Sequence, residues 1–199
     1  MDSWVECRDE YEDFAEDYFP AKILPNDAGW IKVVAWIKCI VTFGVCKPQD
    51  FLDRFAFTLG PNQYFPGSMN YLAERTIVHE CRHSWQYSLF GWAVPIAGWF
   101  FGKRVRAWCG VPFFLFFYFI LFLPLGLAYF RWILEADADY SECSWMIQNK
   151  YTKEEVMDEA RGFGHLVCGS DYGWAWPSWL GGTRKFIKNA EKIIELYGD

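Results

Sequence analysis

Histidine is scarce in this sequence: only three of its 199 residues are histidine. Two of these, His79 and His83, stand four positions apart. The seven cysteines include no CxxC pair, and seven is an odd number. This pattern is not that of a disulfide framework, and it predicts reduced, mostly buried thiols in a cytoplasmic setting. A disulfide in an exported product is the alternative.

Basic residues are missing where two classes of function need them. Residues 1–27 hold nine acids against two bases, and no basic segment precedes an apolar one, so we expect no secretory signal. A basic stripe with interleaved aromatic residues is also absent, which gives no support to a nucleic-acid partner. With no internal repeat and no clean domain boundary, we expect a single domain over residues 1–199.

Charged residues are absent from two long spans, 84–102 and 107–130, which the sequence Lys103-Arg104-Val105-Arg106 separates. The second span is long enough to cross a bilayer, and tryptophan and tyrosine near its ends are typical of membrane interfaces. The alternative is a helical hairpin that is buried in a soluble protein or in an assembly such as a virion. In either case we expect an apolar helical hairpin over residues 84–130, which could contact a membrane or a virion.

Aromatic residues make up 21% of the chain, far more than in disordered proteins. Extended aromatic segments on both sides of Gly60-Pro61-Asn62 predict a β-hairpin. Asn70 is the expected N-cap of a helix that runs to about Phe90. Composition and periodicity predict further helices over residues 3–18, 28–45, 131–150, 152–162 and 183–197. The predicted fold is therefore mainly α (α+β), with a small edge β-sheet.

The sequence His79-Glu80-Cys81-Arg82-His83 is a complete HExxH motif within the predicted helix. Positions four apart lie on the same helix face, so both imidazoles can reach one metal ion. Glu80 is then placed to deprotonate a water that zinc acidifies. These spacings predict a zinc site with Glu80 as the catalytic base. Cys81 points about 200° away from His79 and need not be a ligand.

A catalytic zinc ion normally has a third protein ligand. The candidates are Glu135, Asp137, Asp139 and His165. Glu135 and Asp139 repeat the four-residue spacing on a predicted helix, so Glu135 could complete the ligand set while Asp139 accepts the distal N–H of a ligand histidine. Asp137 points roughly opposite and is the weaker candidate. His165 fits better as a packed or surface residue, or as a group that stabilises an oxyanion.

The HECRH segment, followed 52 residues after His83 by Glu135-x-x-Ala138-Asp139, resembles the glutamate-zincin metallopeptidases. It is most similar to the CAAX prenyl protease and heat-shock membrane protease group. The resemblance implies a zincin-like helical domain in which His79, His83 and Glu135 bind zinc. It also implies that Glu80 is the general base and that Asp139 is the supporting aspartate.

Over roughly residues 50–180 the chain also resembles small HExxH proteins of tailed bacteriophages. The segments that carry this likeness are DFLDRFAFTLGPNQYFP, HECRHSWQ, LPLGLAYFRWILEADADY and YGWAWP. This likeness implies a fold and a site more than a substrate.

The function that we predict is zinc-dependent hydrolysis of peptide bonds in a polypeptide substrate. Residues 55–59 could line the cleft and pair with an extended substrate by strand addition. Tyr140 and Tyr172 could donate hydrogen bonds to a tetrahedral intermediate, and packing in the core or in a loop is the alternative for each. The alternative function is a non-catalytic zinc-binding protein of a virion or a membrane. A third is an amidase that acts on a cell-wall or small substrate.

Overall fold

The structure of the chain is a computed structural model, which describes residues 7–41, 47–69, 72–91, 102–119, 129–169 and 178–197. The chain divides into two compact units, Met1–Phe116 and Phe117–Asp199, and each is described by itself. The boundary between them falls near the end of a helix. The single domain that the sequence suggests over residues 1–199 stays a prediction.

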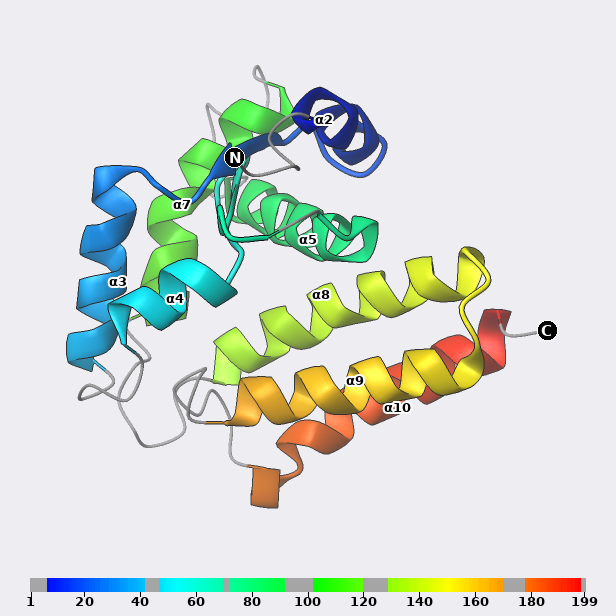
Figure 1. Ribbon diagram of the computed structural model, residues 1–199. Coiled ribbons are helices and arrows are strands. Elements are labelled where there is room, and N and C mark those ends of the chain that lie inside the picture. Colours follow the sequence, from blue (N-terminus) through cyan, green and yellow to red (C-terminus); the bar gives the residue numbers. More distant parts are fainter. Residues whose placement is uncertain are drawn as a thin grey trace. The chain divides into compact units, whose positions relative to one another are not determined.

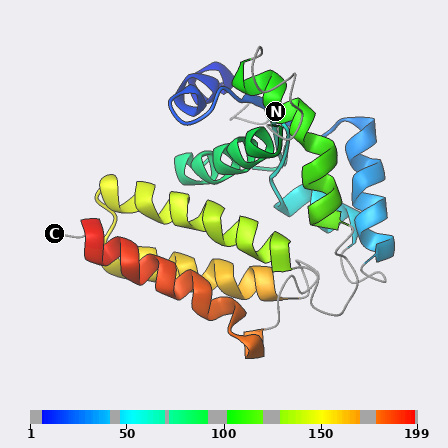
Figure 2. The same ribbon diagram turned by 180° about the vertical axis from the view of Figure 1, so that it is seen from behind.

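Unit 1 combines helices with a small sheet, and Figures 1 and 2 show them from opposite sides. Its helices are α2 (Arg8–Glu16), α3 (Gly29–Val41), α4 (Pro48–Arg54), α5 (Glu74–Gly91) and α7 (Lys103–Phe119). Its strands are β1 (Lys22–Pro25), β2 (Phe57–Leu59) and β3 (Asn62–Phe65). The strand order is β1-β3-β2, with β1 parallel to β3 and β2 antiparallel to it, so β2 is an edge strand.

The turn between β2 and β3 depends on Gly60, which has a φ of +61°. Glycine adopts this backbone conformation at no steric cost, as tight hairpin turns require. A Cβ atom at this position would also meet the side chains of Trp108 and Val111 on α7, at 3.2–3.3 Å. The hairpin that the sequence predicts is thereby confirmed, and its turn lies under α7.

Helices α5 and α7 approach each other through glycine. A Cβ atom on Gly110 would clash with the carbonyl oxygen of Tyr87, and one on Gly91 would clash with the carbonyl oxygen of Arg106. The two backbones therefore pack without a side chain between them. Helix α7 and the last part of α5, from residue 84 on, belong to the span 84–130 that we predicted as an apolar hairpin. The segments 92–101 and 120–128 of this span lie outside the described residues.

Unit 2 is built on three helices that lie side by side in both views (Figures 1 and 2). They are α8 (Tyr129–Gln148), α9 (Lys153–Cys168) and α10 (Gly182–Tyr197), with a short 3-10 helix η2 (Ser178–Leu180) before the last. Phe186 and Ile193 of α10 and Met146 of α8 are buried in its core. Thr152 begins α9 with a capping box, in which its hydroxyl accepts from the Glu155 N–H and the Glu155 carboxylate accepts from the Thr152 N–H.

The mainly α fold with a small sheet is confirmed, since eight α-helices and three strands occur among the described residues. Two helix boundaries were predicted wrongly. Helix α9 continues to Cys168 rather than ending near residue 162, and α5 begins at Glu74, while Asn70 lies outside the described residues. Strand β1 and helix α4 were not predicted, and the residues of α4 from Phe51 on were expected to be extended. Of the described helices, none combines the length and the apolar character that a membrane-spanning helix needs.

Candidate metal centre

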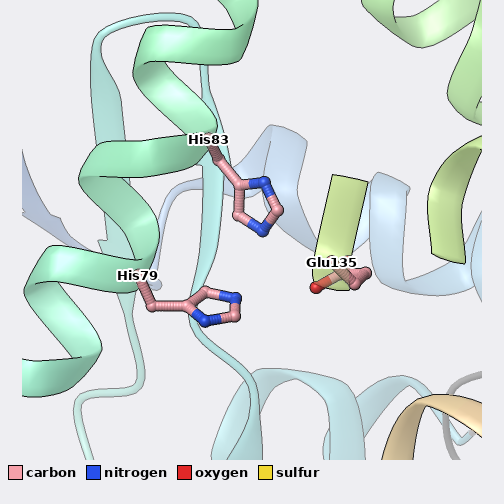
Figure 3. A group of neighbouring side chains, drawn as sticks. All are labelled: His79, His83 and Glu135. Atoms are coloured by element: carbon pink, nitrogen blue, oxygen red, sulfur yellow. The ribbon is translucent and has the colours of Figure 1, made fainter. Parts of the chain in front are cut away.

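The HExxH segment lies in the middle of α5, and both histidines are buried, at 4% and 7% exposure. Figure 3 shows the two imidazoles projecting from successive turns of the helix to the same side. Their ring centroids are 5.0 Å apart, and a nitrogen of His79 lies within 4.8 Å of a nitrogen of His83. The helix thus presents two imidazoles to one point, as the motif predicts.

His83 is held from its own helix. Its Nδ1 lies 2.9 Å from Oε1 of Gln86, three positions further on, and both side chains are buried. An amide oxygen can only accept, so this contact is a hydrogen bond when Nδ1 carries the proton. Nε2 then keeps its lone pair for a metal ion.

Glu80 points to the sheet side of α5, where Thr58 of β2 meets it. The Thr58 hydroxyl donates to Glu80 Oε2 at 2.5 Å, and it also lies 3.2 Å from the Glu80 carbonyl oxygen. Both side chains are buried. A hydrogen bond to a carboxylate is short and strong, so β2 fixes the position of the predicted base.

Tyr87 makes a second hydrogen bond between α5 and β2, in which its hydroxyl donates to the carbonyl oxygen of Thr58 at 3.0 Å. This carbonyl lies on the edge strand that we expected to pair with an extended substrate. A peptide added along β2 would find this acceptor already used by Tyr87. Strand addition along residues 55–59 stays a prediction, and it would require another acceptor or a displaced Tyr87.

The two middle residues of the motif lie away from the histidines. Cys81 is buried, and its Sγ accepts a hydrogen bond from Gln63 Nε2 at 3.1 Å. Burial raises the pKa of this thiol to about 12, so it stays protonated at neutral pH, unlike a zinc-binding thiolate. Arg82 stacks over the exposed ring of Trp85 at 4.0 Å. Neither residue acts as a ligand in this arrangement.

The remaining candidates belong to unit 2. On α8 a stripe of charged side chains is buried, namely Arg131, Glu135, Asp139 and Glu142. Their spacing of about one turn places them on one helix face. Glu135 is 1% exposed and Asp139 is 0% exposed, and Figure 3 shows the Glu135 side chain where it leaves α8. Charge is rarely buried without an ion or another charge to compensate it.

The weaker candidates occupy other environments. Asp137 is half-buried, outside the buried face of α8. His165 is exposed near the end of α9, which agrees with a surface residue rather than a ligand. Tyr140 is half-buried on α8, and Tyr172 lies outside the described residues.

The hydrogen bonds that Gln86, Thr58 and Tyr87 make in this region were not predicted, although Thr58 lies within residues 55–59, which we expected to line the cleft. Gln86 could have been found, because it follows His83 by three positions and so shares its helix face. The hydrogen bonds of Thr58 and Tyr87 form because β2 packs on α5, and the spacing of residues along the sequence does not predict this packing.

Comparison of the chain with family models, with curated proteins and with solved structures gives no match. The resemblance to glutamate zincins and to the phage proteins therefore stays a prediction that depends on the motifs alone.

Proposed function

We propose that the chain is a zinc-dependent hydrolase that cleaves peptide bonds, with zinc bound by His79 and His83 of unit 1 and by Glu135 of unit 2. The observation that carries the proposal is the pair of buried imidazoles on successive turns of α5, beside a buried carboxylate that Thr58 holds in place.

The donor set suits zinc. Two imidazole nitrogens and one carboxylate oxygen are the protein ligands of a common class of catalytic zinc site, and they leave one coordination position open. His79 and His83 of unit 1 offer the two imidazoles, and Glu135 of unit 2 offers the carboxylate. All three side chains are buried, which lowers the competition from bulk water.

When bound, zinc supplies Lewis acidity toward water and toward the scissile carbonyl. The chain supplies the proton transfer. Glu80 adjoins the first ligand histidine, and we propose that it takes a proton from the attacking water and passes it to the leaving amine. Thr58 keeps Glu80 in position during this cycle, and Asp139 supports a ligand histidine.

The test compares two glutamate variants of the same helix, with fluorescently labelled denatured casein as the probe. Glu80→Gln should keep its zinc, since it changes no ligand, and should lose hydrolysis by about 10²- to 10⁴-fold. Glu74→Gln is the control, because Glu74 is an exposed residue of the first turn of α5. Zinc-loaded Glu80→Gln protein that cleaves casein at the wild-type rate would contradict the proposal. Zinc-loaded wild type that leaves casein intact would favour the non-catalytic alternative.

A further inference from the structure

We infer that Gln86 is a positioning residue that fixes the tautomer of His83, so that Nε2 is the nitrogen that binds the metal. The inference rests on the proposed zinc site, and it assigns a role that the HExxH motif does not include. Gln86 touches neither the metal nor a substrate in this account, and it acts only through His83.

The geometry of the pair supports this role. Gln86 Oε1 lies 2.9 Å from His83 Nδ1, and the two residues are three positions apart on α5. Gln86 is 2% exposed, so water competes little for its amide. Because both side chains leave the same rigid helix, little entropy is lost when they pair.

A neutral imidazole carries its proton on only one of its two nitrogens, and the other nitrogen keeps the lone pair that a metal ion needs. An acceptor at Nδ1 favours the form with the proton there. Gln86 presents its oxygen to Nδ1, so Nε2 is left for the metal. Removing the acceptor leaves both tautomers accessible, and the ring is also less well oriented.

Another buried glutamine provides a matched control. Gln63 of β3 is 0% exposed and also bonds to α5, through the thiol of Cys81. Gln63→Met therefore makes the same chemical change in the same unit, and it removes a hydrogen bond to the same helix. It leaves both histidines untouched.

The experiment measures the zinc dissociation constant by competition with a chromophoric chelator, on proteins whose folding is verified by circular dichroism. Gln86→Met should weaken zinc binding about 10- to 100-fold, which is the usual effect of removing a residue that hydrogen-bonds to a metal ligand. Gln63→Met should leave the zinc dissociation constant unchanged. Gln86→Glu should keep zinc binding at wild-type strength or better, because a carboxylate can only accept.

The outcomes separate this inference from the proposed function. Wild-type protein that binds no zinc would overturn both. Wild-type affinity in Gln86→Met, equal weakening in Gln63→Met, or lost zinc binding in folded Gln86→Glu would overturn the role of Gln86 alone. A second measurement needs no variant: nitrogen-15 NMR of the metal-free wild type should show the His83 proton on Nδ1. A proton on Nε2 instead would also overturn the inference.

Discussion

At the scale of single residues, α5 shows how a helix can be buried and still carry polar side chains. His83 is paired with Gln86, and Glu80 is paired with Thr58, so polar groups on two sides of the helix have partners inside the protein. Buried polar groups are tolerated when they are hydrogen-bonded. The motif is thus maintained by residues that lie outside it.

Thr58 provides the first test at this scale. Thr58→Val keeps the shape of the side chain but removes the hydroxyl that holds Glu80, whereas Thr58→Ser keeps the hydroxyl. We expect Thr58→Val to lower casein hydrolysis by about 10- to 100-fold, because a displaced base loses its alignment with the water. Thr58→Ser should recover most of the rate, and both variants should bind zinc as the wild type does. Equal loss in the two variants would show that the hydroxyl is not the cause.

Cys81 predicts a dependence of stability on pH. Its pKa is about 12 in the folded protein because it is buried, whereas an unfolded cysteine ionises near its ordinary value of 9.0. The unfolded chain therefore releases this proton first, and the contribution of Cys81 to stability is full below about pH 9 and declines as the pH rises toward 12. Urea unfolding of metal-free protein should show a steeper alkaline loss of stability in the wild type than in Cys81→Ala. Parallel curves for the two proteins would contradict this.

The sequence was most informative at this scale where the chemistry is local. His79, Glu80 and His83 follow from a five-residue spacing on a helix, and Cys81 was rightly placed away from them. Thr58 was out of reach because 22 positions separate it from Glu80, and only the packing of β2 on α5 brings them together.

At the scale of elements, the contact between α5 and α7 depends on glycine. We expect Gly110→Ala to destabilise unit 1 by about 1–3 kcal/mol. The added methyl group would clash with the carbonyl oxygen of Tyr87 and force α5 and α7 apart. Chemical denaturation followed by circular dichroism measures this change.

The control is a second glycine inside a helix. Gly162 of α9 has nothing within 4 Å of an added Cβ, so Gly162→Ala should stabilise the protein by about 0.5–1 kcal/mol through helix propensity. If Gly162→Ala also destabilised the protein, the loss of stability in Gly110→Ala could not be assigned to the close approach of α5 and α7.

Element types were predicted better than element ends. Periodicity predicted α3, α8 and α10, and the Gly60-Pro61 turn predicted the β2–β3 hairpin. The start of α5 and the end of α9 were missed, because α5 begins at Glu74 and Gly162 does not end α9. Helix α9 continues through Gly162 because Val167 and Cys168 are buried against the rest of unit 2. Strand β1 has only four residues, and its parallel pairing with β3 spans 40 positions of sequence.

At the scale of the whole molecule, the proposed ligands come from both units. A ligand that binds only the folded state stabilises it by about 2.7 kcal/mol when its concentration is 100 times its dissociation constant. We therefore expect zinc to raise the thermal unfolding midpoint and a chelator to reverse the rise. The His79→Ala/His83→Ala double variant should show no such response. A rise of equal size in that variant would indicate zinc binding elsewhere in the chain.

We propose that Glu135 is the third protein ligand of a zinc ion that His79 and His83 also bind. The most direct test of this proposal is the zinc content and zinc dissociation constant of purified Glu135→Gln, beside the wild type and an Asp137→Asn control from the same helix. We expect one zinc ion per wild-type chain, wild-type affinity in Asp137→Asn, and a marked loss of affinity in Glu135→Gln. Full zinc occupancy at unchanged affinity in Glu135→Gln would contradict the proposal.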